Sequence, residues 1–120
     1  MGIGLGEVEI KLMNAAGELQ PVTLKPSLRA TKLLSRNEGG LMATAQQIMN
    51  LNLDTFVRVI DLGVGFTEKG KEGLDQRVYD TGLAELSAPL VRFVHILING
   101  GKPPKDSGEV DDEGEAGGNS

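Results

Sequence analysis

Polar and apolar residues alternate near the N-terminus of the chain. Residues 7–12 have a period of two, and their apolar members share one face: Val8, Ile10 and Leu12. This alternation predicts a half-buried strand. A turn follows at residues 14–17, and residues 19–25 return as a second strand in which Pro21 favours an edge position. The pattern predicts a β-hairpin, which must pack on another element because a lone hairpin is only marginally stable.

Apolar residues recur with helical spacing over most of the remaining chain. The first helix is predicted from Ser27 to about Asn37, with Gly39 and Gly40 ending it. A second helix follows, and its predicted core face comprises Leu41, Met42, Ala45, Ile48 and Met49. After a glycine-rich loop at residues 63–73, a short helix is predicted near residues 74–80. The last helix runs to Asn99, and Pro89 either begins its main stretch or kinks it.

A third helix between these has apolar residues on two sides. Asn52 or Asp54 can cap it, and its predicted core face comprises Leu53, Phe56, Val57, Ile60 and Val64. Val59 and Leu62 fall on the opposite side. Either the helix is central and covered on both sides, or Val59 and Leu62 contact a partner protein.

These elements predict an α+β fold, a hairpin packed on four to five helices. The predicted boundaries are a flexible N-terminus at residues 1–5, one folded domain at residues 6–100 and a disordered acidic tail at residues 101–120. From Gly100 onward the chain carries six acids and two lysines, a balance of −4, whereas the preceding residues carry ten basic and eleven acidic side chains. Such a glycine-rich acidic segment buries too little apolar surface to order itself.

Composition excludes several classes of protein. The 120 residues contain no cysteine, which excludes disulfides, thiolate metal sites and cysteine nucleophiles. A net charge of −5 disfavours binding to nucleic acid or to an anionic membrane. No run approaches the eighteen or so apolar residues that a membrane span needs. Without a recognisable secretory signal, a cytoplasmic location is expected.

Two glycine-rich segments resemble nucleotide-binding motifs only in part. Residues 65–72 match a phosphate-binding loop until Glu72 replaces the Ser or Thr that would hold magnesium, and they follow a helix instead of a strand. Gly2, Gly4 and Gly6 precede a strand, which is the reverse of a dinucleotide fingerprint. Residues 65–72 are therefore interpreted as a flexible connector, and residues 2–6 as a loose terminus.

No catalytic set is evident, and the sequence predicts neither an enzyme nor a cofactor. His95, the only histidine, is predicted on an exposed polar face with Arg92 and Asn99. The acids of the folded part are scattered, with no pair marked as general acid and base. Residues 111–113 lack the spaced ligands and the glycine of a calcium loop, so no metal site is predicted.

The order of several short motifs resembles a known family. The motifs are Gly6-Glu7-Val8-Glu9-Ile10, Leu24-Lys25-Pro26-Ser27 with Ala30, Gly39-Gly40-Leu41, and Thr81-Gly82-Leu83-Ala84-Glu85-Leu86-Ser87-Ala88-Pro89. Together they resemble the small gene transfer agent and phage (prophage) tail proteins of alphaproteobacterial type, over roughly residues 6–100. These are described as tail assembly chaperones or as tail tube proteins. The chain departs from the family at Leu28, often an aromatic residue, and at Ser35, often Glu.

The resemblance implies a non-enzymatic role in virion assembly. Its implied partners are the tape measure protein, which a chaperone coats, and the tail tube protein that polymerises around it; a homo-oligomer is left open. Val59 and Leu62 are the candidate partner-binding residues, and the competing interpretation assigns them to the core. The alternative function is a structural tail tube or tail completion component, which would be located in the tail of the particle.

Some tail assembly chaperones are also made in a longer form by ribosomal frameshifting. Gly100-Gly101-Lys102, at the end of the folded part, could be encoded by a run of G nucleotides followed by a run of A nucleotides. Such a run is a common site of ribosomal slippage. Gly-Gly-Lys is also a common way to leave a helix, and this second interpretation is preferred. The codons decide between them.

Overall fold

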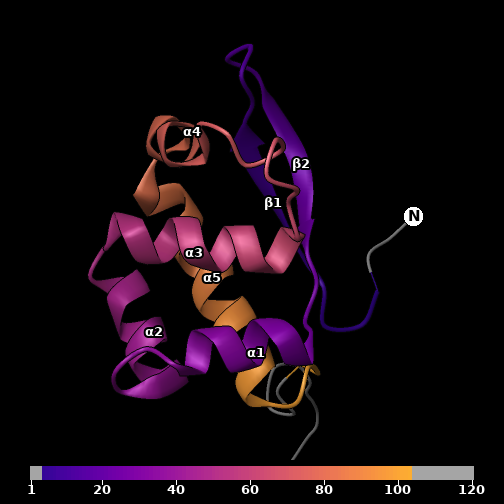
Figure 1. Cartoon of the computed structure of the whole chain (residues 1–120), viewed down its shortest axis with the longest axis vertical. Coiled ribbons are helices and arrows are strands. Elements are labelled where there is room, and N and C mark those ends of the chain that lie inside the picture. Colours follow the sequence, from indigo (N-terminus) through magenta and orange to yellow (C-terminus); the bar gives the residue numbers. More distant parts are fainter. Residues whose placement is uncertain (1–3, 104–120) are drawn as a thin grey trace, which may run out of the picture.

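A two-stranded antiparallel sheet packs against a group of helices, as Figure 1 shows. The computed structural model describes residues 4–103. Within them the elements, in chain order, are β1 (Val8–Met13), β2 (Leu19–Leu24), α1 (Leu28–Ser35), α2 (Gly40–Met49), α3 (Leu53–Val64), α4 (Leu74–Thr81) and α5 (Leu83–Ile98). The predicted α+β class, with an N-terminal hairpin and a set of helices, is confirmed.

Local hydrogen bonds explain why the hairpin turns where it does. The Asn14 side-chain oxygen accepts hydrogen bonds from the backbone N–H groups of Ala16 and Glu18, both at 2.9 Å. Gly17 takes a φ of +84°, which glycine adopts without a side-chain penalty. Pro21 of β2 lies opposite Lys11 of β1 and is exposed, as expected for an edge strand.

Side-chain caps fix the beginnings of α1 and α3. The Ser27 hydroxyl accepts the Ala30 N–H at 3.0 Å, and the Asn52 side chain accepts the Thr55 N–H at 3.1 Å. Each cap satisfies a donor that a helix N-terminus leaves without a partner. Ser27 was expected to open the first helix, and Asn52, of the two candidates, caps the third.

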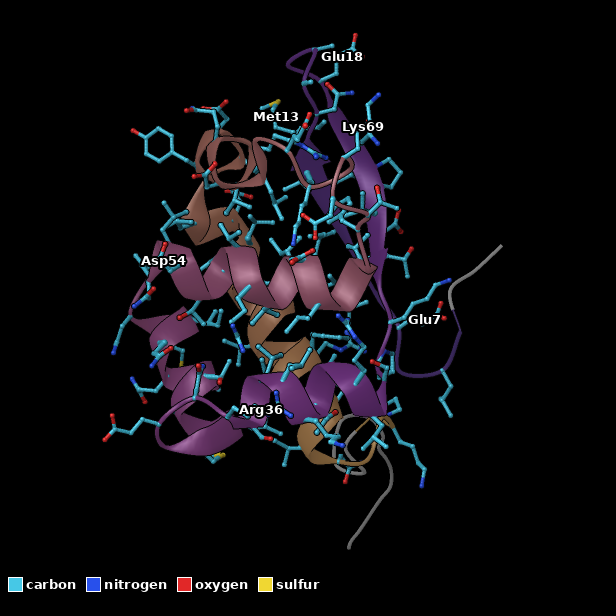
Figure 2. All side chains as sticks on the ribbon, in the orientation of Figure 1. Glu7, Met13, Glu18, Arg36, Asp54 and Lys69 are labelled. Atoms are coloured by element: carbon cyan, nitrogen blue, oxygen red, sulfur yellow. The ribbon has the colours of Figure 1, made fainter. Side chains whose placement is uncertain are left out.

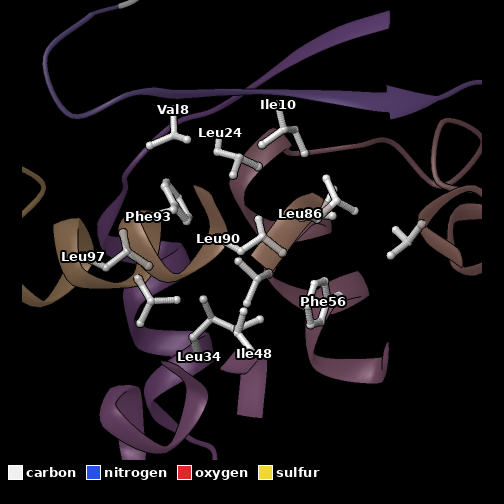
Figure 3. Packing of buried hydrophobic residues seen from close by; sticks show 14 of the residues in the cluster. Val8, Ile10, Leu24, Leu34, Ile48, Phe56, Leu86, Leu90, Phe93 and Leu97 are labelled. Atoms are coloured by element: carbon white, nitrogen blue, oxygen red, sulfur yellow. The ribbon is translucent and has the colours of Figure 1, made fainter. Parts of the chain in front are cut away.

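The core lies between the hairpin and the helices, with α5 through its centre (Figures 1 and 3). Val8, Ile10 and Leu12 of β1 are buried, which confirms the predicted inner face of the strand. Phe56 of α3 and Phe93 of α5 are the largest fully buried side chains. Figure 3 shows Phe93 close to the hairpin residues Val8 and Leu24, whereas Phe56 lies beside Leu90.

The predicted core face of the second helix is partly wrong. Met42 and Met49 are exposed, and the fully buried positions of α2 are Thr44, Ala45 and Ile48. Thr44 tolerates burial because its hydroxyl accepts from the Asn37 amide at 3.0 Å and donates to the Gly40 carbonyl at 3.1 Å. A periodicity that counts only apolar residues assigns Thr44 to the outside and so rotates the helix.

Two further boundaries differ from expectation. Gly63 belongs to α3 instead of the following loop, because its lack of a side chain lets Leu24 of β2 pack against the helix. Its carbonyl accepts the Lys25 N–H at 2.9 Å. Pro89 lies inside α5, in its second turn, so of its two predicted roles it does not begin the helix.

Hydrogen bonds tie α4 to the outer edge of β1. The Met13 N–H donates to the Thr81 hydroxyl at 2.8 Å, and the Met13 carbonyl accepts from Arg77 Nε at 2.9 Å. The Arg77 guanidinium also lies 5.5 Å from the centre of the Phe66 ring. Figure 2 shows Met13 at the α4 end of the hairpin. These contacts cover an edge that could otherwise pair with another strand.

The ends of the folded domain meet each other. The Glu7 N–H donates to the Gly4 carbonyl at 3.1 Å, so the last two residues of the N-terminal segment predicted to be flexible, 4 and 5, lie in a turn. A Cβ built on Gly6, whose φ is +80°, would clash with the Gly101 carbonyl oxygen, which requires glycine at this crossing. The predicted disordered tail lies outside the described residues from position 104 onward.

Candidate partner-binding surface

Val59 and Leu62 do not form an open surface. Val59 is 0% exposed in the core, and Leu62 is half-buried and packed against the same cluster. The helix α3 is central and covered on both sides, because β2 packs on it at Gly63 and α5 lies behind it (Figure 1). The predicted partner-binding role of Val59 is therefore corrected: a fully buried side chain cannot contact a partner while the core stays closed.

The glycine-rich loop after α3 cannot cradle a phosphate in this conformation. The N–H groups of Gly70, Lys71 and Glu72 are already bonded within the loop. The Lys71 ammonium lies 3.4 Å from the Glu68 carboxylate and 3.7 Å from that of Asp61. A phosphate-binding loop needs backbone donors and a lysine directed at the ligand, so these contacts favour the connector interpretation.

Five charged side chains of the described region, Asp54, Arg58, Asp61, Lys71 and Asp75, line a depression of about 560 Å³ beside α3, where Lys71 lies 3.7 Å from Asp61. His95 is exposed on α5 with Arg92 and Asn99, as predicted. Residues 4–103 contain no group of three or more His, Asp or Glu side chains able to hold a metal ion. In the same range no single helix is long and apolar enough to span a membrane; α4 and α5 reach the required length only together, across a bend of 107°.

A shallow apolar groove lies where α1 begins and α5 ends. It measures about 360 Å³ and is lined by Pro26, Ser27, Leu28, Thr31, Leu97, Gly100 and Gly101. Leu97 is almost fully buried, whereas Leu28 is 75% exposed at the first position of α1. Figure 1 shows the C-terminal end of α5 next to this end of α1. We call this feature the α1–α5 groove.

The Ser27 cap and the final glycines create this groove. The cap fixes the start of α1, so Leu28 projects from its first turn. The Gly101 N–H donates to the Ile96 carbonyl at 2.8 Å, and φ values of +73° and +85° at Gly100 and Gly101 turn the chain toward Pro26. An exposed leucine beside an apolar depression offers a place where an apolar side chain of a partner can be buried. Sequence periodicity missed it because the two helices lie at opposite ends of the chain.

A second exposed apolar region lies on α2. Met42 and Met49 are seven residues apart and therefore lie on the same side of the helix. Leu51, just past the end of α2, is about half exposed and has a φ of +63°, the only positive φ of a residue other than glycine within residues 4–103. Its N–H donates to the Ile48 carbonyl, and the Asn52 N–H donates to that of Gln47, both at 3.0 Å. This is a Schellman motif, whose left-handed position usually holds glycine.

The strain at Leu51 can be measured with a matched pair of variants. We expect Leu51→Gly to be more stable than Leu51→Ala by about 1 kcal/mol, because both remove the leucine but only alanine keeps the left-handed penalty. At Gln46, an exposed position inside α2, the order should be the opposite: we expect Gln46→Ala to be more stable than Gln46→Gly by about 1 kcal/mol. Urea unfolding of the four variants tests this. Equal stabilities of the two Leu51 variants would contradict the left-handed conformation.

Comparison of the chain with protein-family models, with curated proteins and with solved structures gives no match.

Proposed function

We propose that this protein is a tail assembly chaperone of a phage-like particle or gene transfer agent. In this role it binds the tape measure protein without chemical conversion and assists assembly of the tail tube around it. The observation that carries the proposal is the α1–α5 groove with its exposed Leu28, on a domain whose motif order resembles that family. Partners would be the tape measure protein and the tail tube protein, met in the cytoplasm of the producing cell.

The chemistry of the groove suits such a partner. A tape measure protein is a long helical chain with apolar seams, which aggregate when exposed. A binder for one seam needs an apolar depression for an anchoring side chain and a polar rim. Leu28, Pro26 and Leu97 supply the apolar part, and Ser27 and Thr31 supply hydroxyls at its border.

Substitution of Leu28 tests where the partner binds. When the tape measure protein is co-expressed with the tagged protein, we expect Leu28→Asp to lower the amount recovered at least about tenfold, as loss of a central apolar anchor does. The fold should persist, because Leu28 is exposed and an acid is favourable in the first turn of a helix.

Met42→Asp is the matched control. Met42 is also an exposed apolar residue in the first turn of a helix, α2, but it does not line the groove. The amount of tape measure protein recovered with the Met42→Asp variant should equal the amount recovered with the unsubstituted protein. Equal losses in both variants would place the contact elsewhere, and no recovery by the unsubstituted protein would contradict the proposed function itself.

The alternative function is a structural tail tube or tail completion component. Tube subunits generally supply enough strands to build a continuous β ring, whereas residues 4–103 supply a single two-stranded sheet whose β1 edge is partly covered by α4. Mass spectrometry of purified particles separates the two functions. A chaperone should be nearly absent from the particles, and a tube subunit should be abundant.

A further inference from the structure

We propose that the acidic C-terminal tail binds a basic surface on α1 of the same molecule. We call this surface the α1 basic stripe; it comprises Lys25, which precedes the helix, Arg29 and Lys32 within it, and its C-cap Arg36, all of which are exposed. The last three recur at intervals of three and four residues, so they follow one side of the helix. No acid interrupts residues 25–37, and the next acidic residue is Glu38.

A fifth positive charge reaches α1 from a neighbouring helix. The Arg58 side chain on α3 donates to the Leu33 carbonyl at 2.8 Å, which places its guanidinium against α1. Within residues 4–103 the salt bridges are those of Lys71 with Asp61 and Glu68, and the stripe takes part in neither. Asp54 and Asp61 lie about one turn to either side of Arg58 on α3. The stripe therefore concentrates positive charge on a domain whose remaining charges are mixed.

The tail leaves the domain beside this stripe. A Cβ built on Gly101 would lie 3.5 Å from Cβ of Pro26, one residue after Lys25. The eight residues of α1 extend about 12 Å, whereas the 17 residues from 104 to 120 can span up to about 55 Å. The tail is therefore long enough to follow the whole stripe.

Charge complementarity favours this occupant. The tail segment from 104 onward has one lysine and six acids, Asp106, Glu109, Asp111, Asp112, Glu113 and Glu115. Tethering gives it an effective concentration on the order of millimolar, so individually weak ion pairs suffice to keep it bound at low ionic strength. An acidic ligand would have to displace the tail to reach the stripe. This contact depends on the charges of this chain alone, whatever protein binds the α1–α5 groove.

A spin label on the tail of the full-length chain tests the contact. Because the chain lacks cysteine, Ala116→Cys provides a unique attachment point. At about 20 mM salt we expect the label to reduce the amide signals of Arg29, Lys32 and Arg36 at least about twofold, and about 1 M salt should restore them, because the Debye length falls to about 3 Å. Changing the six tail acids to Asn or Gln should also restore them.

Two matched variants establish which basic residues matter. Combining Arg29→Glu, Lys32→Glu and Arg36→Glu should abolish the broadening on α1, whereas the same charge change at Lys11, Lys69 and Arg92 should leave it. Preserved amide dispersion verifies the fold of each variant. Equal broadening over the whole surface, broadening that ignores salt, or equal loss in the two variants would overturn the proposal. Mixing isotope-labelled chains with spin-labelled unenriched chains reports contacts between molecules, and broadening of that origin would overturn it too.

Discussion

Phe93→Ala should lower the free energy of unfolding by about 3–5 kcal/mol, the cost of removing a large aromatic side chain from a closed core. Phe93 is 0% exposed and lies where α5 meets both the hairpin and α3. A Cβ built on Gly63 would lie only 3.2 Å from its ring, so little space surrounds it. For a small domain, whose total stability is about 5–15 kcal/mol, this loss threatens folding at physiological temperature.

Thermal and urea unfolding measure the effect. Each kcal/mol lowers the melting temperature by about 4–8 °C in a domain of this size. Val91→Ala, at a half-buried position of the same helix, is the control and should cost less than half as much. If Phe93→Ala has the same melting temperature as the unsubstituted protein, the assignment of Phe93 to the core is wrong.

Gly63→Ala should destabilise the protein although it improves helix propensity. Alanine gains about 1 kcal/mol over glycine inside a helix, but the added Cβ would lie 2.8 Å from Cδ2 and 3.2 Å from Cβ of Leu24. Leu24 is fully buried and cannot move away without disturbing the hairpin. Such overpacking typically costs about 1–3 kcal/mol, so we expect a net loss.

The cost of Gly63→Ala should become smaller once Leu24 is truncated. Leu24→Ala alone should cost about 2–5 kcal/mol through the cavity it leaves. In that background the 2.8 Å contact with Cδ2 is gone, whereas Cβ of residue 24 and the Phe93 ring stay at 3.2 Å, so adding Gly63→Ala should cost less than it does in the unsubstituted protein. A double-mutant cycle by urea unfolding measures the coupling. Additive effects would show that β2 and α3 are not in close contact at Gly63.

Local sequence signals, namely strand alternation and helix caps, predicted the fold well. The alternation of Val8, Ile10 and Leu12 gave the inner face of β1, and Ser27 and Asn52 marked two helix starts correctly. These signals are local, because a strand alternates and a cap bonds within three residues. These local signals can therefore be recognised in the sequence without knowing how the elements pack.

Errors arose where burial depends on contacts that the spacing of apolar residues does not report. Thr44 is buried only because Asn37 and the Gly40 carbonyl satisfy its hydroxyl, and its burial turns Met42 outward. Gly63 reads as a loop residue until Leu24 is seen against it. Val59 reads as surplus on the helical face until the covered position of α3 is known. The α1–α5 groove joins residues about 70 positions apart, which periodicity within one helix cannot detect.

The most direct test of the proposed chaperone function is the aggregation of the tape measure protein itself. Light scattering after dilution of that protein from denaturant measures aggregation at increasing ratios of this chain. We predict suppression that saturates once the tape measure protein is fully coated, with Leu28→Asp much less effective and Met42→Asp fully effective. Unchanged scattering at every ratio, with the protein folded, would contradict the proposal.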